Sequence, residues 1–428
     1  MEVPQFLYPK YEERNLVYMN KNSMNPKDIK LFKNLNLDRD FKDLKTEYEE
    51  YFLEENKKTR DTLTLLTEEE VIFEEKNKLL DFLDGFRKNK FMNKKYNLGK
   101  YFTNAFRKMY EICMRTDFVE IGSRKIRHFD ICGMPGGFVF AINHFLKTRR
   151  RRIEYDWYIQ SYIKDEGDEA YFDDYYGLIK KNRQRHLTGD GTGDITKPEN
   201  IEIYYDFFKN KRCDIVSSDC GLGMDDVYSL ESKSYTREKQ MSKIFYGQLI
   251  CGMLVLKKGG NFFMKTYHSF SPFFISLVYL LGLNFKKVSI VKPESSRQPG
   301  GREIYLLCFD LKRELGDAEK DSLVSILSDF DGETLNKNLI STSKMDKKII
   351  INIQEKLIRY YSSKMKLKIR KSKFTEQLFE FFVTEDKEKY FERKKELLEQ
   401  MRWPKLEYYK KYFGRMGYRK IKDTDRLV

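Results

Sequence analysis

The stretch DICGMPGGF, residues 130–138, constrains the fold of this chain more than any other. The residues before it, 126–132, are apolar enough for a buried parallel strand, and residues 138–146 carry apolar side chains at helical spacing. The turn between them contains Gly133, Gly136 and Gly137. Glycines let a backbone turn tightly and approach a ligand, and the first N–H groups of the helix add a polar cradle. The stretch predicts a strand, a ligand-binding turn and a helix. An ordinary glycine-rich turn would have the same local pattern, and the motif is neither a dinucleotide fingerprint nor a P-loop.

Strand and helix patterns alternate along the chain after this turn. The predicted strands cover residues 155–163, 213–221, 260–267, 285–293 and 303–311, and the main helices between them cover residues 237–256 and 272–283. This alternation predicts a doubly wound α/β sheet from about residue 120 to 312. Asp219 and Lys265 lie at strand ends, which line the ligand crevice in such a sheet.

Composition favours a nucleic-acid partner. Lys and Arg number 81 against 66 Asp and Glu, a net charge of +15, and aromatic residues make up 15% of the 428 residues. No stretch approaches the roughly 20 apolar residues of a membrane span, and the first residues lack the apolar region of a signal peptide. We therefore expect a cytoplasmic protein with no membrane partner. The six cysteines form no C-x-x-C pair and the four histidines are scattered, so we expect no metal site and reduced, buried thiols.

Both flanks of the predicted sheet look helical. Residues 1–95 are highly charged, with an apolar helical pattern over 66–86, and residues 313–428 lack glycine-rich turns. Residues 356–373 hold eight basic residues interleaved with Tyr360 and Tyr361, a pattern that favours contact with RNA or another acidic surface over a solvated face. A second basic run, residues 147–152, either caps a helix end or binds phosphate. The candidate RNA-binding residues are Arg149, Arg150, Arg151, Arg152, Lys364, Lys366, Lys368 and Arg370.

Two further residues have open interpretations. Lys108 lies off the apolar stripe of a predicted helix over 97–115, where a solvated lysine is the default. Asp194, in the loop TGDGTGDIT, either accepts hydrogen bonds from a ligand or caps the helix that Pro198 begins.

Taken together, these motifs resemble the FtsJ-like (RrmJ-fold) RNA ribose 2′-O-methyltransferases, specifically the cap-methylating members of large cytoplasmic DNA viruses. The resemblance runs from about residue 97 to 310. Its motifs, in chain order, are TNAFRKMYE, DICGMPGGF, GDGTGDIT, SSDCG, GGNFFMKTY and KPESSRQPGGREIYLLC.

The resemblance implies a Rossmann-like, seven-stranded methyltransferase sheet with an antiparallel edge strand. It divides the chain into a helical N-terminal extension (1–95), a methyltransferase domain (96–312) and a helical basic C-terminal region (313–428). The implied catalytic residues are Lys108, Asp219, Lys265 and Glu303. The implied contacts to the cofactor S-adenosylmethionine come from Gly133, Pro135, Gly136, Gly137 and Asp194. Two positions depart from the family pattern: Cys220 follows the aspartate, and residues 155–163 lack an obvious terminal acid for the cofactor ribose.

The implied activity is 2′-O-methylation of the first transcribed nucleotide of capped mRNA, with capped mRNA and other capping or transcription proteins as partners, in the host cytoplasm or virion if the protein is viral. A methyltransferase of ribosomal or transfer RNA and a catalytically silent RNA-binding capping subunit are the alternatives. A free lysine, with a pKa of about 10.4, is a poor base at neutral pH. We therefore expect that Lys108 opposite Lys265 lowers the pKa of one of them, with Lys265 the base, the two carboxylates orienting the pair and no metal needed.

Overall fold

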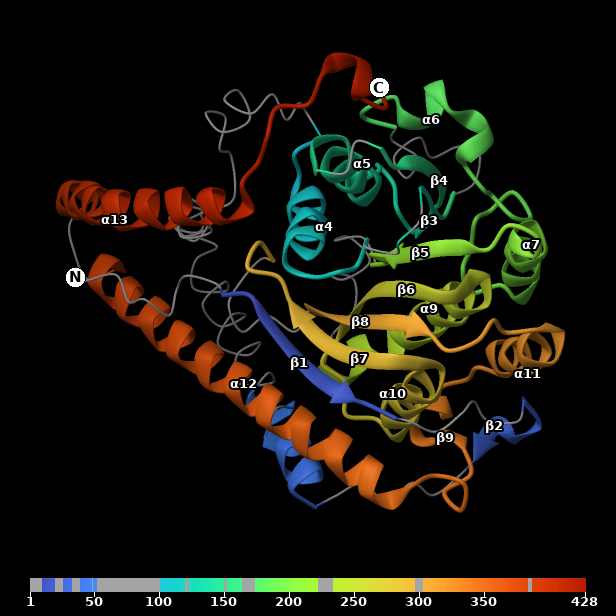
Figure 1. Cartoon of the computed structure of the whole chain (residues 1–428). Helices are drawn as coiled ribbons and strands as arrows, with labels where there is room; N and C mark the ends of the chain where they lie inside the picture. Colours follow the sequence, from blue (N-terminus) through green and yellow to red (C-terminus); the bar gives the residue numbers. More distant parts are fainter. Residues whose placement is uncertain are drawn as a thin grey trace.

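A mixed seven-stranded sheet forms the centre of the molecule, in the order β1-β7-β8-β6-β5-β3-β4 (Figure 1). The computed structural model describes residues 10–19, 26–32, 39–47, 49–51, 101–119, 122, 124–149, 152–163, 174–221, 234–296, 303–383 and 387–428. Helices cover both faces of the sheet (Figure 1). The predicted doubly wound α/β class is therefore confirmed.

Four parallel strands form one half of the sheet. They are β3 (Lys125–Ile131), β4 (Glu154–Gln160), β5 (Cys213–Ser218) and β6 (Leu256–Tyr267). In the other half, β8 (Glu303–Leu311) runs antiparallel to both β6 and β7 (Phe285–Lys292). The carboxyl ends of the parallel strands β3, β5 and β6 therefore meet the start of β8 at one edge of the sheet.

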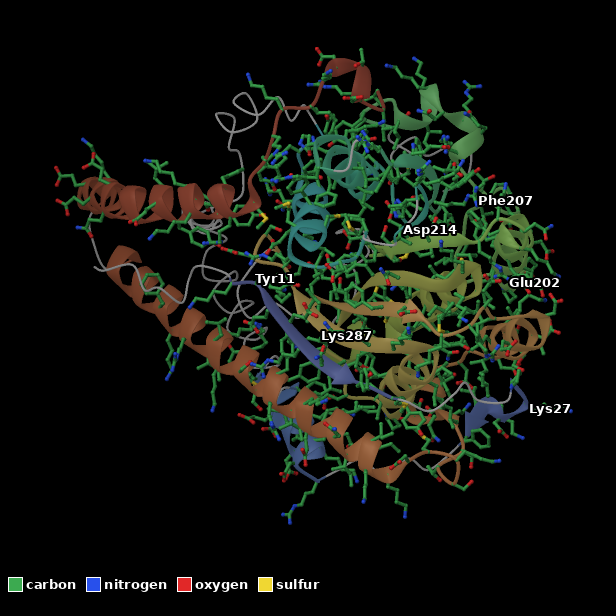
Figure 2. The ribbon with its side chains drawn as sticks, viewed as in Figure 1. Tyr11, Lys27, Glu202, Phe207, Asp214 and Lys287 are labelled. Atoms are coloured by element: carbon green, nitrogen blue, oxygen red, sulfur yellow. A yellow bond between two sulfur atoms is a disulfide. The ribbon has the colours of Figure 1, made fainter. Side chains whose placement is uncertain are left out.

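The N-terminal segment supplies the antiparallel edge strand, β1 (Glu12–Val17), which pairs with β7. Lys287 of β7 (Figure 2) pairs with Glu13 of β1, with an Nζ–Oε1 distance of 2.7 Å. A second short strand, β2 (Ile29–Phe32), pairs with β9 (Asn338–Ile340). The prediction of a helical N-terminal extension is wrong for these segments, because pairing with distant strands overrides their local composition. The helix predicted over 66–86 lies outside the described residues.

Helices α4 (Asn104–Arg115) and α5 (Gly137–Arg149) pack in the core of one face, and α7 (Pro198–Phe208), α9 (Ser234–Val255) and α10 (Pro272–Asn284) in that of the other. Pro198 begins α7, as predicted. Helix α10 is buried on all sides from its second residue onward, since it lies between β7 on one side and α12 and β9 on the other.

The C-terminal region is mostly helical, as predicted, with α11 (Asp317–Ser328), α12 (Lys347–Val383) and α13 (Lys387–Met416). Helix α12 runs alongside β1 (Figure 1). The short helices are η2 (Pro26–Asp28), α6 (Leu178–Lys181), η4 (Arg183–Arg185), η5 (Thr334–Asn336) and η6 (Asp423–Asp425). Across the described part of the chain, no helix has the length and apolar character needed to cross a membrane. The sheet takes β1 from outside the predicted 96–312 domain, and the domain boundaries themselves stay predictions.

Candidate functional site

Helix α4 carries Lys108 into the interior. Thr103 caps the helix by accepting a hydrogen bond from the Phe106 N–H (3.2 Å), and a buried face that includes Phe106 and Met109 fixes α4 against the core. Lys108 is 7% exposed, and its Nζ lies 2.9 Å from Glu303 Oε1 at the start of β8. The default expectation of a solvated lysine is therefore wrong, because the carboxylate of a distant strand compensates the buried charge.

A second ion pair lies at the ends of β5 and β6. Lys265 Nζ is 3.1 Å from Asp219 Oδ1 and also donates a hydrogen bond to the Asp219 carbonyl oxygen at 2.9 Å. Lys265 is 8% exposed. The structure thus brings together all four residues implied by the resemblance, Lys108, Asp219, Lys265 and Glu303, which we name the lysine–carboxylate cluster.

Tyr305 joins the two ion pairs. Its hydroxyl lies 3.2 Å from Asp219 Oδ1 and 3.2 Å from Glu303 Oε1, so it can donate to either carboxylate. The ring is fully buried and stacks on Phe263 with centroids 4.6 Å apart. Sequence reasoning missed Tyr305. The signal was its place two residues after Glu303 on one strand, which puts both side chains on the same face of the sheet.

Two more residues of the same region hold Glu303. Ser296 donates its hydroxyl to Glu303 Oε1 at 2.9 Å, and Lys292 Nζ donates to the Glu303 carbonyl oxygen at 2.6 Å. Both side chains are buried. Sequence reasoning missed these contacts too, since the strand that ends in Lys292 showed no chemical pattern of its own.

The electrostatics of the cluster differ from the expectation. Burial disfavours the ammonium of Lys265, but Asp219 and Glu303 outweigh burial and raise its pKa. Burial also raises the pKa of Glu303, yet Lys108, Lys292 and Lys265 outweigh it and hold that pKa below its usual range. Beside the cluster, burial lowers the pKa of Lys292 to about 8. The expected lowering of the pKa of one of the two lysines is therefore not found at Lys265, because Asp219 and Glu303 both face it.

The glycine-rich turn lies directly beside this cluster, after β3. A Cβ atom at Gly133 would lie 2.4 Å from Asp130 Oδ2, and one at Gly137 would lie 2.7 Å from the Ala105 side chain. Gly136 has a φ of +99°, and a Cβ there would meet Leu178 at 2.4 Å. The glycines therefore let the turn pack closely against its own protein, which is a separate reason for their presence from the approach of a ligand.

Asp130 gives the turn an unsatisfied acceptor. Ser217 donates to Asp130 Oδ1 at 2.5 Å, while Asp130 Oδ2 is buried and has no hydrogen-bond partner among the described residues. Burial raises the pKa of this carboxyl well above its usual range. A buried carboxyl oxygen without a hydrogen-bond partner beneath a glycine-rich turn fits a ligand that brings a polar group to it. Pro135 follows Met134 through a cis peptide bond in this turn.

The second glycine-rich loop is tied to the first by Gln160, the last residue of β4. Gln160 Oε1 accepts from the Cys132 N–H at 3.1 Å, and its amide donates to the Gly193 carbonyl oxygen. An amide thus stands at the end of the strand where the family pattern has an acid. Asp194 Oδ1 accepts from the N–H and hydroxyl of Thr196, both at 2.8 Å. These bonds close a turn before α7, whose N-cap is Lys197 with no side-chain cap, so the predicted capping of that helix by Asp194 is wrong. The contact of Asp194 with a cofactor stays a prediction.

Two cysteines flank the site and are joined. Cys132 precedes Gly133, Cys220 follows Asp219, and a disulfide links them across 88 residues of sequence. The expectation of six reduced thiols is wrong for this pair. Strands β3 and β5 are parallel neighbours with Ile131 opposite Ser218, so the residues that follow each strand end at the same place. The other four cysteines are free and buried, as expected.

The predicted RNA-binding residues separate into structural and exposed groups. Arg149 donates to the Gly417 carbonyl oxygen at 2.5 Å, and Lys364 is buried and paired with Glu12. Tyr360 and Tyr361 are fully buried, so they cannot stack on RNA in this structure. Helix α12 packs against β1 and α10, which explains why Lys364, Tyr360 and Tyr361 are buried and not exposed to RNA as predicted. The remaining described candidates, Arg152, Lys366, Lys368 and Arg370, are exposed or half-buried, while Arg150 and Arg151 lie outside the described residues.

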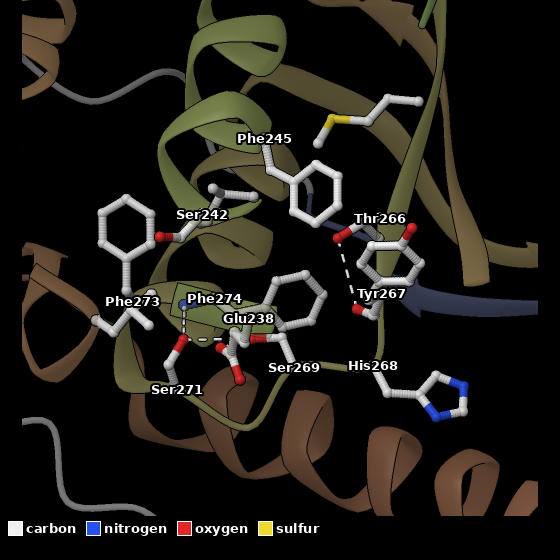
Figure 3. A pocket seen from close by; sticks show the side chains of 13 residues that line it. Glu238, Ser242, Phe245, Thr266, Tyr267, His268, Ser269, Ser271, Phe273 and Phe274 are labelled. Carbon is white, nitrogen blue, oxygen red and sulfur yellow. Dashed lines mark hydrogen bonds between the residues drawn. The ribbon is translucent and has the colours of Figure 1, made fainter. Parts of the chain in front are cut away.

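A separate small pocket lies between α9, α10 and the end of β6 (Figure 3). Its walls are mainly apolar, and Glu238 reaches the Ser269 hydroxyl at its base. Met264 and Thr266 line it, so it lies on the face of β6 opposite Lys265. The pocket is therefore not part of the lysine–carboxylate cluster.

The chain is similar to known methyltransferases over the segment that holds the cluster. A family model described as FtsJ-like methyltransferase matches residues 101–311. An uncharacterized protein of Acanthamoeba polyphaga mimivirus is 28% identical over 332 residues, which are 73% of this chain and 40% of that protein. A probable methyltransferase of African swine fever virus is 28% identical over 339 residues, covering 74% of this chain and 76% of that protein.

A third relative has a more specific name. The cap-specific mRNA (nucleoside-2′-O-)-methyltransferase 1 of Danio rerio is 32% identical over 193 residues, which are 43% of this chain. The match spans 21% of the length of the Danio rerio protein. It therefore concerns one part of that longer protein.

Proposed function

Because residues 101–311 are an FtsJ-like methyltransferase domain, we propose that the protein transfers a methyl group from S-adenosylmethionine to the ribose 2′-O of the first transcribed nucleotide of capped mRNA. The observation that carries the proposal is the pair of ion pairs, Lys108–Glu303 and Lys265–Asp219, bridged by Tyr305 at the strand ends beside the glycine-rich turn. Moving a methyl group to a hydroxyl needs alignment and removal of a proton, and this arrangement supplies a base with fixed partners.

The residues of the turn fit the cofactor. We assign its binding to the backbone around Gly133, Pro135, Gly136 and Gly137, with Asp194 on the adenosine side. The orphan Oδ2 of Asp130 and the first N–H groups of α5 are the polar groups available there. When bound, S-adenosylmethionine supplies an electrophilic methyl group on a sulfonium.

Lys265 then acts as the base in the proposal. Lys265 Nζ, once neutral, would accept the proton of the ribose hydroxyl whose oxygen takes the methyl group that S-adenosylmethionine would supply. Asp219 holds the amine in place from 3.1 Å. Because the pKa of Lys265 is raised, its ammonium must lose a proton before it acts as the base, and positive charge added at the site would favour that loss.

Cap specificity is the finer part of the proposal. It is supported by the name of the Danio rerio relative and by the long regions outside residues 101–311. A methyltransferase of ribosomal or transfer RNA would use the same cluster, so the cluster does not choose between these substrates. The alternative of a catalytically silent RNA-binding capping subunit is less favoured, since all four residues of the cluster are present and paired.

Methyl transfer to two forms of one short RNA tests the proposal. We expect radiolabelled methyl from S-adenosylmethionine to appear on the 2′-O of the first nucleotide of the capped RNA and not on the uncapped RNA. Nuclease digestion followed by chromatography locates the label. Equal labelling of both forms would favour a non-cap RNA substrate, and label in neither would favour the silent subunit.

A further inference from the structure

We propose that Glu111 is a positioning residue that sets Glu303 opposite Lys108 by holding residues 292–296 against helix α4. The inference rests on the proposed function, because it gives Glu111 a part in methyl transfer without contact to the reacting atoms. We name Glu111 and the segment 292–296 the α4 clamp.

Glu111 accepts three hydrogen bonds and pairs with one arginine. Its Oε1 accepts from the Glu294 N–H at 2.9 Å, and its Oε2 accepts from the Ser295 N–H at 3.0 Å and from the Ser295 hydroxyl at 2.9 Å. Arg115 Nε lies 3.1 Å from Oε1. Glu111 is completely buried. Two successive backbone N–H groups therefore depend on this side chain for their acceptors.

The clamped segment contacts Glu303 at both of its ends. Ser296, next to the residue that Glu111 holds, donates to the Glu303 carboxylate at 2.9 Å. Lys292, at the other end, donates to the Glu303 carbonyl oxygen at 2.6 Å. A shift of the segment would therefore move both the backbone and the carboxylate of Glu303.

Helix α4 thereby fixes both partners of one ion pair. Lys108 and Glu111 are three residues apart on the helix, and such residues lie on one face. Lys108 reaches Glu303 directly, while Glu111 reaches it through the segment. The relative position of Lys108 and Glu303 thus depends on one rigid element.

The same segment connects the cluster to the C-terminal region. The Glu294 side chain pairs with Arg115 of α4, with an Oε2–Nη2 distance of 2.6 Å, and with Arg415 of α13. Helix α13 therefore also contacts the clamp. Its Arg415 is the second arginine paired with Glu294 and is more exposed than Arg115.

A purely structural role is the competing explanation, and Glu319 provides its matched control. Glu319 of α11 is also a buried carboxylate that accepts a backbone N–H, that of Gly316 at 2.9 Å, and it also pairs with an arginine, Arg313. It lies in a helix on the opposite face of the sheet from α4. Loss of either carboxylate should destabilise the fold, but only loss of Glu111 should disturb the cluster.

The experiment compares Glu111→Gln with Glu319→Gln in the full-length chain. We expect Glu111→Gln to lower kcat at least tenfold while the affinity for S-adenosylmethionine, measured by calorimetry, changes less than twofold. We also expect faster acylation of Lys108 by an N-hydroxysuccinimide ester, followed by mass spectrometry, because Lys108 loses the partner that covers it. Glu319→Gln should match the wild type in kcat and in Lys108 labelling, with a similar fall in melting temperature.

The labelling separates the inference from the proposed function. If the wild type methylates no capped RNA, the proposed function fails, but the Lys108 labelling rates still decide whether the clamp exists. Labelling of Lys108 at the same rate in both variants would overturn the inference. If Glu111→Gln does not fold, Ser296→Ala takes its place, with Ser322→Ala of α11 as control. If Lys108 is then labelled at the same rate in Ser296→Ala as in Ser322→Ala, the inference is overturned.

Discussion

At the scale of single residues, Lys265 is the most informative position. Its ammonium is almost buried, and it donates to the Asp219 carbonyl while pairing with the Asp219 carboxylate. A lysine held in this way is either a base or a fixed positive charge. The two roles differ in what happens when the side chain is replaced by one that keeps the charge.

We expect Lys265→Ala to lower kcat by at least about a hundredfold, the usual contribution of a positioned base. Affinity for S-adenosylmethionine and RNA should stay nearly unchanged, the pattern of an interaction made chiefly in the transition state. Lys265→Arg should fail almost as badly, because guanidinium stays protonated. Single-turnover rates at saturating substrate test this, with Lys258→Ala on the same strand as control. A fully active arginine variant would rule out Lys265 as the base.

The raised pKa of Lys265 predicts the pH dependence of the reaction. A base acts only when it is deprotonated, and below its pKa the deprotonated fraction rises tenfold per pH unit. The profile of kcat/KM reports the free enzyme. Log kcat/KM should therefore rise with a slope near +1 from about pH 6 to 9 without levelling off. A plateau that begins near pH 8 would instead point to Lys292, whose pKa is lowered to about 8.

At the scale of secondary-structure elements, the ends of the strands could be predicted from the sequence, but the contacts made between paired strands could not. The strand ending near Lys265 and the one starting at Glu303 match β6 and β8 closely, since apolar runs and glycine turns are local signals. Tyr305 and Lys292 acquire their contacts only when β7 and β8 pair, and pairing is not a local property. Lys364 is another example. It lies on the buried face of α12, but in the sequence it stands among basic residues and was predicted to be exposed with them.

The disulfide is a testable consequence of pairing β3 with β5. Alkylation of the unfolded protein without reductant should label four of the six cysteines, and reduction should expose Cys132 and Cys220 as well. In the chain-entropy account, a cross-link across 88 residues raises the free energy of the unfolded chain by about 4 to 5 kcal/mol. Cys220→Ser should therefore unfold at a lower denaturant concentration than Cys308→Ser, a control that replaces a free buried thiol by a hydroxyl and breaks no cross-link. Six labelled cysteines without reductant would contradict the cross-link.

At the scale of the whole molecule, the two terminal regions belong to the same structure as the sheet. Glu12 of β1 pairs with Lys364 of α12, and Lys356 of that helix donates to the Leu16 carbonyl oxygen at 3.2 Å. Arg415 of α13 pairs with Glu294 beside the cluster. Regions that looked in the sequence like separate helical extensions are thus held to the edge and to the site of the central sheet.

This packing changes the expected RNA surface. Lys364 is buried and paired with Glu12, so it is not accessible to RNA, whereas Lys366 and Arg370 are exposed one turn apart on the same helix. Each phosphate contact with single-stranded RNA contributes about 0.7 to the slope of log affinity against log salt. Neutralising Lys366 and Arg370 together should therefore flatten that slope by about 1.4 if both contact phosphates.

Filter binding of one capped RNA at several salt concentrations measures the slope. Neutralising Lys347 and Lys348, which are exposed at the other end of α12, removes the same charge and serves as control. We expect the control to leave the slope nearly unchanged, because a defined RNA path contacts a limited set of phosphates. Lys364→Gln should lower the melting temperature without changing the slope. If both double variants flatten the slope equally, the effect is one of net charge, and α12 provides no specific RNA contact.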